Sequence, residues 1–280
     1  MMRVSYLGTT MLLFDDGKDA LLFDCHVTRP SMLRCMLGKM DTDKEVADKV
    51  LSDFDFSRLR GIFISHSHHD HVMDMPYFAG RLGANVYGSP SALQVARGGG
   101  IKEEKLFSYE KQKEYVIGEG RIQVLPSIHS VAHWYNNDLG QTIDAPLTMP
   151  ARKKAFKEGG SFDFLISHQG KRYLLRPSYN FIPGQLDDVQ ADVLFLGIGG
   201  LGKDSPDRRE MFFAQTLDKV RPSLVIPIHW DHFFLPLYGP VKGLEGFMDH
   251  TGLGLRLVAE HCQKRGISFI IQPPLSTMEV

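Results

Sequence analysis

The stretch Ile64-Ser65-His66-Ser67-His68-His69-Asp70-His71-Val72, written ISHSHHDHV, decides how this 280-residue chain folds. It places four of the chain's 12 histidines in six consecutive positions, directly after a run with the character of a buried strand. Alternate side chains of an extended backbone share a face, so His66 and His68 can converge on one metal ion. A bend at Asp70 and His71 would aim those two side chains at a neighbouring ion. Imidazole and carboxylate ligands suit zinc, and also iron or manganese.

Two later histidines stand just past the ends of other strand-like runs. His129 follows Ile122–Ser127, and His229 follows Leu224–Ile228. A catalytic zinc ion takes three protein ligands and a water, so two ions need donors from outside the first cluster. A histidine-rich surface loop is the alternative interpretation, but three strand ends that each supply histidine favour a metal site.

The HSHHDH motif, followed by two strand-end histidines, resembles the metallo-β-lactamase superfamily over essentially the whole chain. Within it, the chain is similar to the short bacterial forms related to the lactonase of phosphorylated ascorbate. The resemblance implies an α/β fold, an αββα sandwich of two mixed sheets flanked by helices. The metal centre of this fold lies at one edge of the two sheets.

The resemblance also implies a set of ligands. The first metal would be held by three histidines, His66, His68 and His129. The second would be held by Asp70, His71 and His229. Asp24, at the end of an early strand, matches a family position that supports the site by hydrogen bonding from behind. We therefore expect one or two divalent ions, with zinc as the first expectation and manganese or iron as further candidates.

The family normally has an aspartate after a central strand, where it bridges both metals. Here Ser178 stands at that place in KRYLLRPSYNF, and no Asp or Glu lies between Asp163 and Asp187. A serine hydroxyl stays protonated at neutral pH and is a poor replacement for a bridging anion. Asp231, near the last histidine, is another carboxylate that could substitute.

Two divalent ions carry a charge of +4, and Asp70 is the only proposed ligand with a negative charge, so the site would be strongly positive. With a bridging hydroxide the ions and ligands sum to about +2, one unit above the value with an aspartate. The second metal should be held less tightly, whereas an anionic substrate should be favoured. Three states remain open: a dinuclear centre bridged by hydroxide or substrate, a mononuclear centre, and a fold that binds without catalysis.

Further residues are candidates for roles around the metals. Asp70 would orient the nucleophile as well as bind metal, and His232 could donate a proton to the product. Arg176, Ser178 and His133 are candidates for substrate binding. A surface ion pair is the alternative for Arg176, and a packed loop anchor is the alternative for His133.

Strand-like and helix-like runs interleave along the chain and predict a layered α/β fold. No linker divides it, so we expect one domain over residues 1–280, with insertions at about 26–60 and 130–160. The expected strands are Arg3–Leu7, Thr10–Phe14, Ala20–Asp24, Gly61–Ser65, Tyr115–Ile117, Ile122–Leu125, Phe162–Ser167, Tyr173–Arg176, Val193–Gly197 and Leu224–Ile228. The expected helices are Lys44–Ser52, Asp74–Leu82, Ser91–Arg97, Asp207–Val220 and Val241–Arg265, the last of which is broken around Thr251 and Gly252.

Composition limits the classes of partner. The net charge is −1, so no global field attracts nucleic acid or an anionic membrane, although Arg152–Lys157 forms one local basic run. No apolar run reaches the ~18 residues of a spanning helix. The three cysteines are scattered without a CxxC pair, and the N-terminus lacks a signal-peptide pattern, so we expect a cytoplasmic protein. Homo-oligomerisation is left open.

These features predict a metal-dependent hydrolase with a small-molecule substrate. A metal lowers the pKa of bound water from 15.7 towards about 7, which supplies hydroxide at neutral pH. That hydroxide would attack an ester, lactone or phosphodiester bond of a small anionic substrate. One alternative is a nuclease or phosphodiesterase that acts on nucleic acid, which the near-neutral charge disfavours. The other is a metal-binding or regulatory protein that has lost catalysis.

Overall fold

The computed structural model describes residues 2–131 and 137–280, and the strands in these ranges form two sheets of seven. The first sheet contains, in spatial order, β14 (Ser276–Glu279), β1 (Arg3–Gly8), β2 (Met11–Asp15), β3 (Ala20–Phe23), β4 (Leu59–Phe63), β5 (Asn85–Gly88) and β6 (Leu106–Ser108). The second contains β13 (Ser268–Phe269), β12 (Leu224–Ile228), β11 (Val193–Gly197), β10 (Lys171–Arg176), β9 (Ser161–His168), β8 (Gly120–Ser127) and β7 (Glu114–Ile117). Both sheets are mixed, with parallel pairing from β3 to β6 and from β10 to β13.

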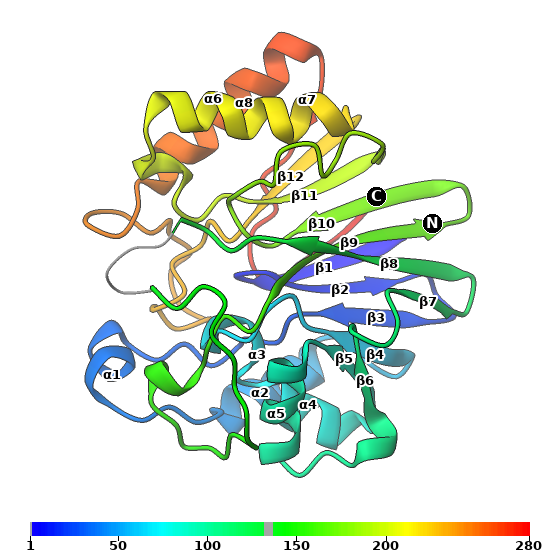
Figure 1. The fold of residues 1–280 in the computed structure, drawn as a ribbon, viewed down its shortest axis with the longest axis vertical. Coiled ribbons are helices and arrows are strands. Elements are labelled where there is room, and N and C mark those ends of the chain that lie inside the picture. The colour runs from blue at the N-terminus through cyan, green and yellow to red at the C-terminus, as the bar shows by residue number, and fades with distance from the viewer. Residues whose placement is uncertain (1, 132–136) are drawn as a thin grey trace.

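Helices cover the outer face of each sheet, and the two sheets pack face to face between them (Figure 1). The first sheet is covered by α1 (Met32–Leu37), α2 (Lys44–Asp53), α3 (His69–Val72), α4 (Met75–Leu82) and α5 (Pro90–Gly98). The second is covered by α6 (Pro206–Gln215), α7 (Leu217–Val220) and α8 (Thr251–Arg265). Short 3₁₀ turns are η1 (Glu103–Lys105), η2 (Lys153–Ala155) and η3 (Leu201–Lys203). The predicted αββα sandwich is confirmed.

Aromatic side chains join the two sheets in a common core. Phe23 of β3 lies 5.1 Å from Phe164 of β9, measured between ring centroids. Phe14 of β2 lies 5.3 Å from Phe195 of β11. All four rings are buried, so alternate residues of facing strands build the layer between the sheets. This packing fixes the relative position of the strand ends that carry the predicted ligands.

The sequence-based assignments fail mainly where elements are short or rich in glycine. The predicted helix Val241–Arg265 is wrong over its first ten residues, because α8 begins only at Thr251. Gly246 has a φ of 95°, and the Thr251 hydroxyl donates to the Leu244 carbonyl at 2.8 Å, which organises a loop before the helix. The strands β5, β6, β13 and β14 were not predicted, since two to four residues show no clear alternation. No helix among the described residues is long and apolar enough to cross a membrane.

Candidate metal centre

The ends of β4, β8 and β12 bring the predicted ligands to one place at an edge of the sandwich. After β4 the chain bends at Ser65, passes through His68 with extended backbone angles, and then turns into the single helical turn α3. This turn separates the cluster into two groups, as the predicted bend requires. The nitrogen and carboxylate atoms of each group lie within 4.8 Å of one another. The groups are His66, His68 and His129, and Asp70, His71 and His229.

In the first group, ring nitrogens converge on a common point. The Nδ1 of His68 lies 3.2 Å from the Nε2 of His129. The Nε2 of His66 is buried and has no hydrogen-bond partner among the described residues. Buried polar atoms are normally paired, so this convergence of nitrogens fits a metal ion as their common partner. Three imidazole donors that converge in this way suit a divalent metal ion.

Three of the donors, His66, His129 and Asp70, have pKa shifts that favour metal binding. Burial holds the pKa of His66 and of His129 well below the usual range, and neighbouring imidazoles lower both further. Burial by itself would raise the pKa of Asp70, but His69, His71 and His229 hold it well below its usual range. Neutral imidazoles and an ionised carboxylate are the forms that bind a divalent cation.

The second group is held from behind by Asp24. Its Oδ2 accepts from the Nδ1 of His71 at 2.8 Å and from the Thr10 hydroxyl at 2.6 Å. Because Nδ1 of His71 is bonded to Asp24, its Nε2 faces the rest of the group and lies 3.8 Å from the Oδ2 of Asp70. Asp24 therefore stands where the sequence analysis placed a supporting carboxylate.

Two residues of this centre have backbone conformations that side-chain-bearing residues rarely adopt. Asp24 and His229 follow β3 and β12 with φ values of 52° and 55°. Such left-handed residues are strained and persist where the surrounding structure imposes them, often at functional sites. Here the turn aims both side chains into the centre, and Gly199 makes room, since a Cβ there would lie 3.1 Å from the Nδ1 of His229.

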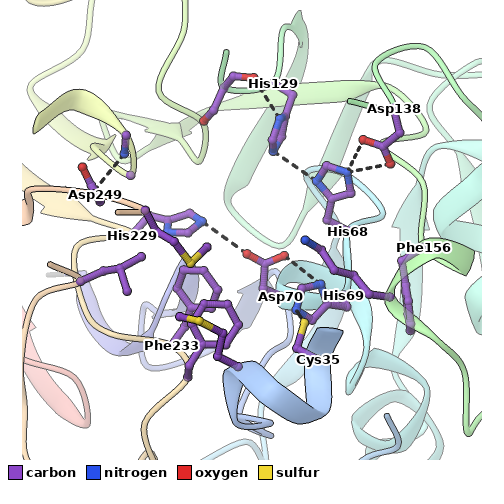
Figure 2. A pocket seen from close by; sticks show the side chains of 18 of the residues that line it. Cys35, His68, His69, Asp70, His129, Asp138, Phe156, His229, Phe233 and Asp249 are labelled. Atoms are coloured by element: carbon purple, nitrogen blue, oxygen red, sulfur yellow. Dashed lines mark hydrogen bonds and ion pairs between the residues drawn. The ribbon is translucent and has the colours of Figure 1, made fainter. Parts of the chain in front are cut away.

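Asp138 is a site residue that the sequence analysis did not find. Both of its carboxylate oxygens lie 3.1 Å from the Nε2 of His68. Figure 2 shows Asp138 and His129 on either side of the His68 ring. Because Asp138 accepts a hydrogen bond from Nε2, the Nδ1 of His68 is the nitrogen that remains for a metal. A carboxylate on the distal nitrogen fixes the tautomer and strengthens the ligand.

We expect Asp138→Ala to weaken metal binding by about tenfold, since supporting carboxylates of this kind are worth about 10–100-fold in affinity. Asp144→Ala is the matched control, because Asp144 is an exposed carboxylate of the same loop that bonds the Thr142 hydroxyl. Titration with zinc against a chromophoric chelator gives the dissociation constants. Equal affinity of the two variants would show that the contact does not position His68.

A cavity of about 630 Å³ opens above the two groups, within the range of small-molecule sites. His68, Asp70, His129 and His229 line it, whereas His66 and His71 are buried beneath its floor. Apolar residues line it too, and Figure 2 shows Phe233 beside His229 and Phe156 beside His69. The ring centroids of these two pairs are 5.3 and 6.2 Å apart.

Comparison with known proteins agrees with this geometry. A sequence model of the metallo-β-lactamase superfamily matches residues 7–202. The chain belongs to this superfamily. A metal-dependent hydrolase of the UPF0173 group from Symbiobacterium thermophilum is 24% identical over 83% of this chain and 85% of its own length.

Solved structures show the same fold at low identity. The metallo-β-lactamase fold protein YhfI from Bacillus subtilis is 14% identical, with a TM-score of 0.62 over 100% of this chain and 99% of its own. CmlA, a diiron β-hydroxylase from Streptomyces venezuelae, is 14% identical, with a TM-score of 0.64 over 100% of this chain and 54% of its own. The metallo-β-lactamase fold therefore carries more than one reaction, and the site must decide which.

Arg176 and Ser178, which the sequence analysis proposed for substrate binding, lie outside the lining of this metallo-β-lactamase cavity. Arg176 is fully buried at the end of β10, where its Nε donates to Asp163 of β9 at 2.8 Å. Its Nη2 donates to the Asn180 carbonyl at 3.1 Å. Ser178 is also buried, and neither Ser178 nor Arg176 is among the residues that line the cavity. Arg176 is instead a buried structural cation.

The positions after His229 also differ from expectation. His232 lies outside the cavity lining, and its backbone N–H donates to the Lys242 carbonyl, so the predicted proton donor is not placed to act there. Asp231 lines the cavity, but Tyr6, the Thr9 backbone N–H and Arg29 occupy its two oxygens, so it does not replace the missing bridge. His133 lies outside the described residues.

Proposed function

We propose that this metallo-β-lactamase superfamily chain, a metal-dependent hydrolase, cleaves an ester, lactone or phosphodiester bond of a small anionic substrate. One observation carries the proposal: two donor groups lie side by side at the floor of a cavity of ligand size. Bound divalent ions supply activated water and stabilise developing negative charge. Zinc is the proposed ion because five of the six donors are imidazoles, and manganese or iron remains compatible with the set.

The chain's own residues orient the reaction. Asp70 lines the cavity as an ionised carboxylate, with its Oδ2 3.6 Å from the Nε2 of His229 and its Oδ1 3.5 Å from the Nδ1 of His69. From there its carboxylate is placed to orient the attacking water. Because His232 lies outside the cavity, we propose that solvent water protonates the product.

Cations near the cavity mouth support an anionic substrate. Arg152, Lys154 and Lys157 all belong to the segment around η2 and line the cavity. Lys157 bonds the neutral amide oxygen of Gln141 at 2.8 Å, so this contact does not neutralise its charge. A local positive field raises the concentration of small anions at the site.

Hydrolysis assays with removal and return of metal test this proposal. Purified protein would be offered p-nitrophenyl acetate, γ-butyrolactone and bis(p-nitrophenyl) phosphate before and after dialysis against a chelator. Hydrolysis that disappears with the metal and returns with zinc is the expected result. Metal binding without hydrolysis of any member would favour a degenerate binding protein, while salt-sensitive cleavage of RNA would favour the nuclease.

A further inference from the structure

Part of the cavity lining is apolar and is not used by chemistry at the metals. Met32 and Met36 contribute from α1, and Phe247 and Met248 contribute from the loop between β12 and α8. Met36 is 59% exposed and Phe247 is 60% exposed, although both line the cavity. Large apolar side chains gathered and exposed at the mouth of a cavity mark a surface that a ligand covers.

Cations border both apolar segments. An Nη of Arg152 donates to the Leu37 carbonyl of α1 at 3.2 Å, and the Nζ of Lys203 donates to the Phe247 carbonyl. Lys154 is exposed on the same segment as Arg152. Positive charge therefore lies at the edges of the apolar surface.

Apart from Asp70, which belongs to the metal-binding groups, the carboxylates in the cavity lining are already occupied by protein donors. Asp138 binds His68, and Asp231 binds Arg29 with two further donors. Asp204 accepts from Tyr179 and Arg208 at 2.9 Å each, and Asp249 accepts from two backbone N–H groups. Arginines compensate the charges of Asp204 and Asp231, and hydrogen bonds occupy oxygens of Asp138 and Asp249, so the cations at the mouth favour an anion.

We propose that the substrate is an anionic amphiphile, a single molecule that joins a negatively charged group to an apolar body of several carbons. The scissile bond lies over the metal groups, the apolar body lies against Met36 and Phe247, and the anionic group lies beside Arg152 and Lys154. This inference rests on the proposed function for the use of the cavity, but it concerns what the cavity binds.

Isothermal titration calorimetry with simple probes, below their micelle concentrations, tests both parts of the proposal on the metal-loaded protein. The apolar half is binding of the carbon chain, and the anionic half is binding of the negative charge. Each buried methylene raises the affinity about fourfold. If the cavity covers roughly half of the additional methylenes of decanoate, decanoate should bind about 100-fold more tightly than butanoate. Decanoate should also bind more tightly than decyltrimethylammonium, which has the same chain and the opposite charge. Equal affinity for decanoate and butanoate would overturn the apolar half, and equal affinity for the two ten-carbon probes would overturn the anionic half.

Matched variants locate the contacts. Met36→Ser should reduce the gain from butanoate to decanoate, whereas Leu33→Ser should not, because Leu33 is 68% exposed on the same helix but lies outside the cavity lining. Lys154→Gln should weaken decanoate about threefold, as for a surface charge pair, while Lys44→Gln on α2 should leave it unchanged. If each variant matches its control, the ligand lies elsewhere.

Binding and hydrolysis separate this inference from the proposed function. Chain-length-dependent binding without turnover of any ester, lactone or phosphodiester would refute the hydrolase and leave the amphiphile site standing. Turnover with no preference between p-nitrophenyl acetate and p-nitrophenyl decanoate, together with equal binding of the acids, would refute only the amphiphile.

Discussion

Asp70→Asn should lower kcat/KM for hydrolysis by at least about 10³-fold. The substitution removes the one anionic member of the two donor groups, which is also the carboxylate that orients the attacking water. Loss of a single preorganised group at a reacting centre costs about 10²–10³-fold, and loss of metal affinity adds to this. Steady-state kinetics at saturating zinc measure the effect, with circular dichroism to show that the fold is retained.

Asp188→Asn is the matched control for this measurement, because it removes one negative charge from an exposed position outside the cavity lining. It should retain the wild-type rate. A wild-type rate in Asp70→Asn would mean that the measured hydrolysis does not occur at this centre.

Arg176→Met should destabilise the fold by about 3–5 kcal/mol, because it leaves Asp163 buried without its cationic partner. Both side chains of this pair are completely buried, and burial already raises the pKa of the Asp163 carboxyl. Urea unfolding measures the change in the free energy of unfolding. Arg172→Met on the same strand is the control, expected within about 0.5 kcal/mol of wild type because Arg172 is partly exposed.

The double variant Asp163→Leu with Arg176→Met separates a buried pair from a substrate contact. Replacing both charges by apolar groups is often close to neutral, so most of the lost stability should return. A single variant with wild-type stability and a raised KM would restore the original substrate-binding interpretation of Arg176.

The strand-end histidines of the site and the fold could be predicted because their signals are local. His66 and His68 alternate in an extended segment after a buried strand, and His129 and His229 each follow a strand whose neighbours fix its place. Strand ends on one edge of a sandwich meet in space. Spacing and strand character were therefore enough to anticipate that these side chains come together.

The remaining parts of the site depend on contacts between distant segments. Asp138 reaches His68 from a loop without periodicity, so nothing near it in the sequence indicates its partner. The buried ion pair of Arg176, in contrast, has a signal in the sequence. Asp163 lies between Phe162 and Phe164 in a buried strand, which indicates that its carboxylate needs a buried cation. The pairing of Leu175 with Phe164, extended by one residue, places Arg176 opposite Asp163.

The central claim is that the two donor groups hold metal. Metal per chain, measured by inductively coupled plasma mass spectrometry on protein purified without an affinity tag, tests it most directly. The predicted result is one divalent ion for each group, about two per chain, with a clear loss in His66→Ala. Wild-type protein from metal-replete medium that carries no divalent ion, and takes none up on addition of zinc, would contradict the account.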